Sequence, residues 1–338
     1  MELSLELASR VKRASSGDLA ELAALRVEQG WYGSEALLRA IHTWDHGRHF
    51  ILRASALGDD AALDPATIIA ATSAIMAGPV AVIGNVITRP GLRGRGLGHA
   101  VMSATLAWLR ETGARSVLLD ATSAGQPLYQ KVGFVAQERS WIAHAPLASL
   151  DLDTLRKRTG ATHVQLRAMD DLPVIAALDQ AAFGGDRLEL LRLVASASDC
   201  WLYTAGGAGE PDGYLLVRAL EPPRTGVRIG PWVAKTAEVG AALLAEALHP
   251  DAPWLAEIAS VGDPQVSDPP VSFSTSAASV EALSLFRAIG GTLELDDVVM
   301  RLDFDSDISS EPGPVNTTLR PVAEHPEWLY SWLAAMVF

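Results

Sequence analysis

The sequence contains a single cysteine, Cys200, in 338 residues. One thiol cannot form an internal disulfide, so nothing in the composition indicates an oxidising compartment. Basic residues are also scarce, with 27 Lys and Arg against 40 Asp and Glu, and the formal net charge is −13. Nucleic-acid affinity depends on neutralising phosphates with basic side chains, so this balance argues against a nucleic-acid partner. It disfavours an anionic membrane surface for the same reason.

Long apolar runs are absent as well. Residues 1–6 are acidic where a secretory signal peptide would be basic, and no long apolar stretch follows them. The apolar stretch 328–338 is too short to span a bilayer. We therefore expect a cytoplasmic protein without a membrane partner. With 49% hydrophobic and 20% charged residues, the chain has a globular profile, and its length predicts about two domains.

The sequence does contain two pairs of similar segments, which indicate an internal duplication. Residues 18–25 (DLAELAAL) match residues 171–178 (DLPVIAAL), and residues 128–133 (LYQKVG) match residues 285–290 (LFRAIG). The first pair predicts an Asp-capped helix, and the second a short helix that ends at a glycine. Two matches in the same order predict duplicated domains instead of a solenoid. We place these domains at 1–145 and 163–338, with a polar linker at 146–162.

Hydrophobic periodicity predicts the same succession of elements in both halves. In the first half, helices are expected at 18–28, 34–43, 97–112 and 124–132, and strands at 50–54, 67–75, 80–88, 116–121 and 134–144. In the second half, helices are expected at 172–182, 187–195 and 237–247, and strands at 201–204, 214–219 and 227–234. Further elements are expected at 271–274, 279–289 and 292–304. Strands come first and helices interleave later, which predicts an α/β fold with a mixed sheet.

A glycine-rich turn between a strand and a long helix carries the clearest chemical signal. Residues 93–98 read RGRGLG and follow the strand residues Val86, Ile87 and Thr88. Glycines permit positive φ and close approach of the backbone, and the N–H groups that open a helix have no internal partner. With two arginines beside them, these groups predict a pyrophosphate site.

A dinucleotide-binding fold is the alternative for this turn. Asp120 lies near the end of the next strand, where that fold places its ribose-binding acid. The glycine spacing, however, is G-x-G-x-G and not G-x-G-x-x-G. The turn also lies several elements into the chain instead of opening the first βαβ unit.

The segment 93–98 resembles the pyrophosphate motif of the GNAT superfamily, R/Q-x-x-G-x-G/A, in residues and in context. Pro90 before it and residues 129–134 (YQKVGF) downstream fit the same pattern. The second half is similar to the degenerate GNAT-like domain of two-domain bacterial members, notably at 183–187 (FGGDR) and 228–232 (RIGPW). The resemblance implies tandem acyl-CoA N-acyltransferase folds, with the catalytic domain first and acetyl-CoA as co-substrate.

The resemblance also implies individual roles. Val86, Ile87 and Thr88 would offer backbone groups to the pantetheine arm where two strands splay apart. The pyrophosphate would be held by Arg93, Gly94, Arg95, Gly96, Leu97 and Gly98. Tyr129 would protonate the departing thiolate, and a phenol is a proton donor at neutral pH. A packing role for the Tyr129 ring at a domain edge is the other interpretation.

The sequence departs from the family at several positions. The strand glutamate that acts as general base in many members aligns with Val82, and an asparagine seven residues before the tyrosine is replaced by Thr122. The amine could bind already deprotonated, or Asp120 or His99 could serve as the base. In the second half, Phe286 stands where Tyr129 stands in the first, and a phenyl ring cannot donate a proton. We therefore expect the second half to be catalytically inactive and to complete the acceptor pocket or a homodimer surface.

Two smaller signals concern the acceptor side and metals. Trp31 and Tyr32 follow the first helix, where the family has an acceptor-side loop, so they and Asp120 are weak candidates for substrate binding. The cluster His42, His46 and His49 has a spacing that suggests metal, but Gly47 interrupts it, and we expect no metal site.

The resemblance implies an N-acetyltransferase that moves an acetyl group from acetyl-CoA to a primary amine of a small molecule by direct attack in a ternary complex. A CoA-binding sensor or scaffold without turnover is the alternative. The acceptor cannot be identified from the sequence, because a fold does not dictate its substrate.

Overall fold

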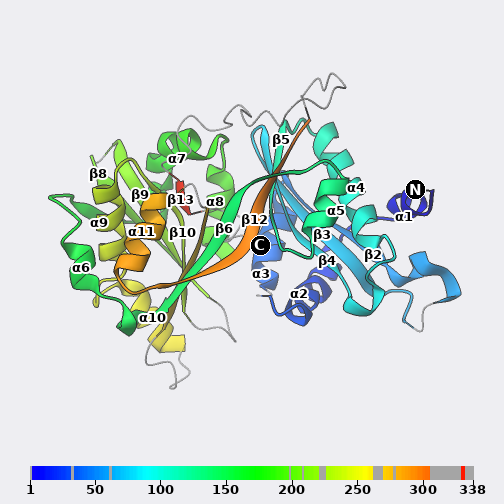
Figure 1. The fold of residues 1–338 in the computed structure, drawn as a ribbon, viewed down its shortest axis with the longest axis horizontal. Helices are drawn as coiled ribbons and strands as arrows, with labels where there is room; N and C mark the ends of the chain where they lie inside the picture. Colours follow the sequence, from blue (N-terminus) through cyan, green and yellow to red (C-terminus); the bar gives the residue numbers. More distant parts are fainter. Residues whose placement is uncertain are drawn as a thin grey trace. The chain divides into compact units, whose positions relative to one another are not determined.

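The computed structural model describes residues 2–31, 34–60, 63–197, 199–207, 209–220, 226–261, 269–276, 279–304 and 329–331. The chain forms two compact units (Figure 1). Of the described residues, unit 1 holds those up to 137 together with 300–304, and unit 2 holds those from 138 to 299 together with 329–331. The position of the domain boundary along the sequence stays a prediction.

Unit 1 alternates strands and helices. Its helices are α1 (Glu2–Ser9), α2 (Leu19–Glu28), α3 (Glu35–Thr43), α4 (Leu97–Glu111) and α5 (Gln126–Lys131), with short 3-10 turns η1 (Ser16–Asp18), η2 (Ala54–Asp60) and η3 (Pro90–Leu92). Its strands are β1 (Lys12–Arg13), β2 (Gly47–Arg53), β3 (Ile68–Ala77), β4 (Val80–Thr88) and β5 (Ser116–Ala121).

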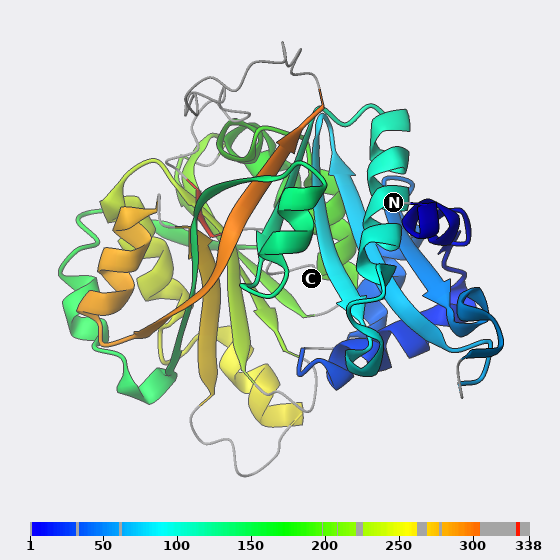
Figure 2. The same cartoon turned by 45° about the vertical axis from the view of Figure 1, so that its right-hand side comes forward.

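The strands of unit 1 are ordered β1-β2-β3-β4-β5. All neighbours are antiparallel except β4 and β5, which are parallel. Two apolar layers flank the sheet. One joins α2 and α3 to Ile51, Ala71 and Ile87, and the other joins α1 and α4 to Leu52 and Ala70. Figure 2 shows helices on both faces of this sheet. Because successive strand residues face opposite sides, each strand contributes side chains to both layers.

A late segment of the chain completes unit 1. The strand β12 (Thr292–Asp303) begins in unit 2, and its last residues belong to unit 1. The Phe304 N–H donates to the Arg115 carbonyl at 3.0 Å, and the Arg110 guanidinium lies 4.5 Å from the centre of the Phe304 ring. A long-range strand therefore supports the segment between α4 and β5.

Unit 2 repeats the plan of unit 1. Its helices are α6 (Leu152–Arg156), α7 (Ala176–Phe183), α8 (Leu188–Ala197), α9 (Ala237–Ala247), α10 (Pro253–Val261) and α11 (Val280–Ala288), with turns η4 (Leu147–Ser149) and η5 (Met169–Ile175). Its strands are β6 (Val135–Pro146, which starts in unit 1), β7 (Val164–Arg167), β8 (Cys200–Gly206), β9 (Pro211–Ala219), β10 (Val227–Ala234), β11 (Pro270–Ser276) and β13 (Leu329–Ser331).

The strands of unit 2 are ordered β6-β11-β10-β9-β8-β7, and β13 also pairs with β10. Here β10 and β11 are the parallel pair, as β4 and β5 are in unit 1. The core is built on Trp232, Trp254 and Phe286, all fully buried. The predicted α/β fold with a mixed sheet is confirmed.

Several predicted elements lie one to three residues from the observed bounds, and others are new. The sequence analysis did not predict α1, α6, α10, β1, β7 or β13. The helix α6 lies within the stretch expected to be a linker, and its Leu155 is fully buried in the unit 2 core. Short helices with one buried side chain carry too little periodicity to be recognised.

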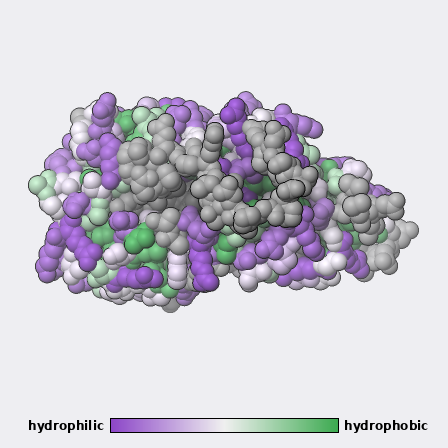
Figure 3. All heavy atoms as spheres, turned by 45° about the horizontal axis from the view of Figure 1, so that its top comes forward, coloured by the Kyte–Doolittle hydropathy of each residue, from purple (hydrophilic) through white to green (hydrophobic). Residues whose placement is uncertain are grey.

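The described surface is largely hydrophilic, with hydrophobic residues scattered over the face shown in Figure 3. Large apolar side chains that are exposed include Val27 on α2, Trp31 just after α2, Val135 on β6, Leu166 on β7 and Val280 on α11. Scattered residues of this kind are normal for a folded chain. Within the described ranges, none of the helices has the length and apolar character needed to cross a bilayer.

Candidate active site

The strands β4 and β5 of unit 1 part from one another. Their parallel pairing covers Val80–Ser116, Ala81–Val117 and Val82–Leu118 and does not extend further along β4. On its other edge, β4 pairs with β3 with a register shift, since Ser73 lies opposite Gly84 and Ala71 opposite Ile87. One extra residue on β4 between these pairs is a β-bulge, which bends the strand. Residues Val86, Ile87 and Thr88 lie beyond this point.

The glycine-rich turn follows directly. After η3, Gly94 has a φ of 80° and Gly96 a φ of 78°, and a Cβ on either would meet nothing within 4 Å. Only glycine adopts this left-handed region without strain. The turn is therefore fixed by backbone conformation, and the space above it is open to a ligand.

The first turn of α4 is left uncapped by side chains. Gly96 is the N-cap residue and has no side chain to accept from the N–H groups of the first turn. Arg93 is held by hydrogen bonds to Gln29 Oε1 at 2.7 Å and to the Thr88 carbonyl at 3.4 Å. Arg95 is exposed and makes no ion pair or hydrogen bond with the described residues. A helix N-terminus and two arginines give this turn a positive potential, which favours an anion.

The turn and the predicted catalytic helix converge at Gly98. A Cβ on Gly98 would lie 3.2 Å from Leu128 Cδ2 and 3.5 Å from Thr88 Oγ1. The end of β4, the start of α4 and α5 therefore meet at one point. Leu128 is followed by Tyr129 on α5, so the structure brings the predicted proton donor close to the predicted pyrophosphate turn.

Tyr129 is 7% exposed and packs closely on both sides. Its ring lies against Gly125, where an added Cβ would come within 2.8 Å of Cε2, and its centre is 6.1 Å from that of Phe134. The Tyr129 N–H donates to the Gly125 carbonyl at 3.2 Å. The ring is consequently held in one orientation.

The remaining candidates are more dispersed. Trp31 is 38% exposed and lies two residues beyond Gln29, which is joined to Arg93, whereas Tyr32 lies outside the described residues. Asp120 is half-buried on β5. His99 pairs with the Ser103 hydroxyl one turn along α4 at 3.3 Å. Val82, at the position of the family's base, is buried.

A buried polar chain in unit 1 was missed by the sequence analysis. The Asn85 amide donates to Ser73 Oγ at 2.9 Å, Ser73 Oγ lies 2.7 Å from His49 Nδ1, and His49 Nε2 lies 2.9 Å from the Leu38 carbonyl. All three polar side chains are less than 10% exposed. Burial lowers the pKa of His49 to about 4, so this imidazole is neutral. The pair Gly84-Asn85 inside an apolar strand was the one available signal, since glycine in a strand often marks a bulge.

The metal interpretation of the histidine cluster finds no support in the geometry. His49 uses both ring nitrogens within the polar chain, and His42 stacks on it with ring centres 6.2 Å apart. His46 instead packs edge-on against Trp44. Among the described residues, no group of three or more metal-ligating side chains is found.

The equivalent positions of unit 2 are built differently. The N-cap of α9 is Thr236, whose side chain accepts from the Val239 N–H at 3.3 Å. Hydrogen bonds from its own N–H and from Thr236 lower the pKa of Glu238, so a carboxylate occupies the first turn. The first-turn N–H groups of α4 have no side-chain acceptor and lie beside arginines. In α9, a hydroxyl accepts from a first-turn N–H and a carboxylate lies nearby.

The strand opening of unit 2 is also filled. The strands β10 and β11 pair only at Val227–Val271 and Arg228–Ser272. Further along β10, beyond a register shift with β9, Trp232 and Val233 pair with β13. Because β9 takes one edge of β10, β13 must take the other, which is the edge that β4 leaves open in unit 1.

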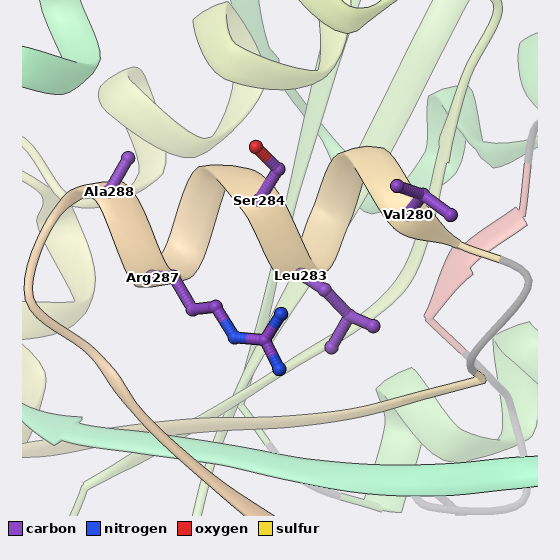
Figure 4. Close-up of a pocket in the computed structure, with 5 residues that line it drawn as sticks. All are labelled: Val280, Leu283, Ser284, Arg287 and Ala288. Carbon is purple, nitrogen blue, oxygen red and sulfur yellow. The ribbon is translucent and has the colours of Figure 1, made fainter.

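Open cavities of unit 2 lie along α11. One has a volume of about 580 Å³ and is lined by residues of α9, of α11 and of the segment that follows α6, including Lys157 and Glu238. Another, of about 520 Å³, lies on α11 alone, and Figure 4 shows Leu283 and Arg287 on one side of that helix and Ser284 and Ala288 on the other. The first cavity has side chains of both charges in its walls, and the second has mainly aliphatic walls beside Arg287.

Comparison with known proteins agrees with this organisation. Residues 20–134 match the model of the acetyltransferase (GNAT) family, and residues 175–252 match a second model, the acetyltransferase (GNAT) domain. The uncharacterized N-acetyltransferase YitH of Bacillus subtilis is 30% identical over 179 residues, which are 52% of this chain and 59% of that protein.

Solved structures share the fold at lower identity. A protein from Pyrococcus horikoshii is 16% identical with a TM-score of 0.64, and the match covers 95% of this chain and 92% of that one. A tandem GNAT protein from the clavulanic acid biosynthesis pathway is 12% identical with a TM-score of 0.59, covering 87% of this chain and 98% of that one. The two family matches fall on the two halves of one polypeptide that share one plan of strands and helices. The chain belongs to the GNAT acetyltransferase superfamily and carries two GNAT domains in tandem.

Proposed function

We propose that this protein is an N-acetyltransferase that transfers the acetyl group of acetyl-CoA to a primary amine of a small molecule. The observation that carries the proposal is the open N-terminus of α4, where Gly94 and Gly96 hold positive φ beside Arg93 and Arg95. This turn lies at the end of a strand that has parted from its neighbour. Both features occur in unit 1, and both are closed or altered in unit 2.

The residues present fit the two polar parts of acetyl-CoA. The pyrophosphate would accept from N–H groups of residues 94–98 and pair with Arg95, which has no competing partner among the described residues. The pantetheine amides would pair with backbone groups of residues 86–88 on the edge of β4 away from β3, because the pairing of β4 with β5 does not extend to these residues. Adding a strand-like ligand to an open strand edge satisfies backbone groups that would otherwise need water.

Proximity would supply most of the rate, since both reactants are held on one strand edge. Acetyl-CoA, when bound, supplies an acetyl thioester. In the transfer, the amine nitrogen forms a bond to the acetyl carbon and the carbon–sulfur bond breaks. Tyr129 would donate its phenolic proton to the departing sulfur. The amine nitrogen releases one proton to solvent after the new bond forms, and Tyr129 takes one proton from solvent to restore its hydroxyl. The protons of the reaction therefore balance.

Unit 2 would contribute no chemistry of its own. Its helix N-terminus is capped by Thr236 and carries Glu238, and its strand edge is paired with β13. Phe286, in the position of Tyr129, is fully buried with its ring centre 4.9 Å from that of Phe273. We therefore infer one acetyl-CoA site per chain.

Calorimetric titration with acetyl-CoA tests the proposal, and the chain offers a matched control at the other end of α4. Gly96 and Gly113 both have positive φ (78° and 89°), and neither has an atom within 4 Å of an added Cβ. Gly96→Glu and Gly113→Glu therefore introduce comparable backbone strain and the same charge. Binding of one acetyl-CoA by the wild type and by Gly113→Glu, and its loss in Gly96→Glu, is the expected result.

Two outcomes would contradict the proposal. Absence of acetyl-CoA binding by the wild-type protein would leave a GNAT-shaped chain with another use. If acetyl-CoA binds but no CoA thiol is released in the presence of any primary amine tested, the result would favour a sensor. The replacement of the family's glutamate by Val82 is consistent with that alternative.

A further inference from the structure

The bulge of β4 carries an unusual residue. Asn85 has a φ of 54° and is the only non-glycine residue with positive φ in the described part of the chain. Such a conformation costs of order 1–3 kcal/mol and persists only where the surroundings fix it, although asparagine tolerates it better than most residues. Asn85 is also 7% exposed and lies three residues beyond Val82, where β4 last pairs with β5. Its side chain is therefore held at the opening between the strands.

The hydrogen-bond chain behind Asn85 fixes the orientation of its amide. The Leu38 carbonyl can only accept, so His49 Nε2 must carry the hydrogen at this 2.9 Å contact. A neutral imidazole then has a bare Nδ1, to which the Ser73 hydroxyl must donate at 2.7 Å. The Ser73 oxygen, with its hydrogen committed, accepts from the Asn85 amide at 2.9 Å. The NH2 group of Asn85 consequently faces Ser73, and its Oδ1 faces away.

Asn85 Oδ1 is buried and has no hydrogen-bond partner among the described residues. Leaving a buried carbonyl oxygen unsatisfied costs about 1–3 kcal/mol, so the orientation of this amide is maintained at a cost. The polar chain belongs to the α2 and α3 side of the sheet, because its last acceptor lies on α3. The pyrophosphate turn opens α4, which packs on the other side. An N–H donor arriving at the opening from the α2 and α3 side would satisfy Oδ1.

The charges around the hydrogen-bond chain of His49, Ser73 and Asn85 favour a neutral N–H donor at Asn85 Oδ1. His49 is faced by His42 of α3, Arg26 of α2 and Arg13 of β1, and each of these lowers its pKa. Arg26 and Arg13 are cations at neutral pH and create a positive potential behind Asn85, which disfavours an ammonium group there. With a pKa of about 4, His49 is also too weak a base to take a proton from an amine at neutral pH.

We propose that Asn85 binds the acceptor amine as its free base, by accepting an N–H of the amine at Oδ1, with Ser73 and His49 as positioning residues. The inference rests on the proposed acetyl transfer and names the group that orients the nucleophile. In this proposal, Asn85 is a neutral hydrogen-bond acceptor that lies three residues beyond Val82, the position of the family's glutamate. The enzyme then selects the deprotonated amine from solution instead of deprotonating it.

The first test is the pH dependence of kcat/KM for amines of different basicity, with 2-methoxyethylamine, glycinamide and aminoacetonitrile as probes beside the acceptor found by screening. The acidic limb is expected at the pKa of each amine and should move when the amine is exchanged. A limb at one common pH for all amines would show that an enzyme group takes the proton, and it would overturn binding as the free base.

The second test is Asn85→Gly, which removes the carbonyl and keeps a residue that adopts a φ of 54° without strain. We expect the KM of the amine to rise about tenfold or more, with the Kd of acetyl-CoA within about twofold of the wild type. Ser73→Ala should raise the KM of the amine less, since it only releases the amide. An unchanged amine KM in Asn85→Gly would overturn the assignment.

Thr72→Val is the matched control. Thr72 is fully buried, precedes Ser73 on β3 and faces the other side of the sheet, where its hydroxyl donates to the Gly84 carbonyl at 3.4 Å. It should lower stability without a selective effect on the amine KM. If the wild type neither binds acetyl-CoA nor releases CoA thiol, the proposed function fails. If the wild type does both and Asn85→Gly has the same amine KM, only the role of Asn85 fails.

Discussion

Nε2 of His49 lies 2.9 Å from the carbonyl oxygen of Leu38, and this contact determines the tautomer of a fully buried histidine. The helix α3 supplies the acceptor and the strand β2 supplies the ring, so the tautomer is set by tertiary packing. From this relationship follow the direction of the hydrogen bonds to Asn85 and a prediction about acid stability.

As the pH is lowered, the free energy of unfolding of the wild type should decrease more steeply than that of His49→Gln. Burial lowers the folded-state pKa of His49 to about 4, below the ordinary 6.5, so the unfolded chain takes up the proton first. The contribution of His49 is fully present above pH 6.5 and is lost as the pH falls toward 4. Between pH 7.5 and 4.5 the loss is about 2 to 3 kcal/mol.

Urea unfolding at both pH values measures this difference. Carboxylates titrate in wild type and variant alike, so the difference between their slopes reports His49. Parallel pH dependences in the two proteins would contradict a buried neutral imidazole.

Tyr129→Phe should separate catalysis from binding. The phenyl ring keeps the packing against Gly125 and Phe134 and removes only the hydroxyl. Because a positioned general acid contributes roughly 10²–10⁴-fold, kcat should fall by about 100-fold or more while the Kd of acetyl-CoA stays near the wild-type value. Thiol-release kinetics and calorimetry on the same preparations measure the two quantities. An unchanged kcat would show that Tyr129 is not the general acid and that its ring only contributes packing.

Arg95→Ala should weaken acetyl-CoA binding without destabilising the fold. Arg95 is exposed and unpartnered among the described residues, so its removal breaks no internal contact. We expect about a tenfold rise in Kd, which corresponds to about 1.4 kcal/mol, and a weaker salt dependence of binding. Titrations at two salt concentrations check both effects. Arg110→Ala, at the far end of α4, should leave the Kd unchanged.

The buried ion pair of unit 2 should be essential for its stability. Asp179 and Arg187 are joined by hydrogen bonds of 2.8 to 3.2 Å, with side chains 4% and 0% exposed, and the Tyr214 hydroxyl donates to the same carboxylate. Asp179→Ala leaves a buried guanidinium without its counter-charge, so the free energy of unfolding should fall by about 3–5 kcal/mol.

Chemical denaturation measures this loss, and the exposed pair Glu189–Arg192 provides the control. Its side chains are 57% and 49% exposed, so Glu189→Gln should change the free energy of unfolding by less than about 0.5 kcal/mol. Similar effects of the two substitutions would indicate that the Asp179 pair is hydrated in solution.

Local patterns were sufficient for much of the fold. The strand β4 and the helix α9 have the predicted bounds, because each is a long periodic run between clear breakers. The helix α6 could not be predicted, since a single buried leucine in five residues gives no periodicity. The contribution of β12 to unit 1 could not be foreseen either, because strand pairing over such a separation leaves no local mark.

The sequence by itself determined the conformation of the glycine-rich turn at 93–98. Gly94 and Gly96 adopt positive φ because glycine lacks a Cβ, and the uncapped helix start follows from the same absence. Only the tertiary structure decided which polar groups meet at the opening of β4. His49, Ser73 and Asn85 come from three strands, and their hydrogen bonds depend on register, on the bulge and on burial under α3. Backbone conformation is a property of neighbouring residues, whereas a buried hydrogen-bond chain exists only once distant strands have paired.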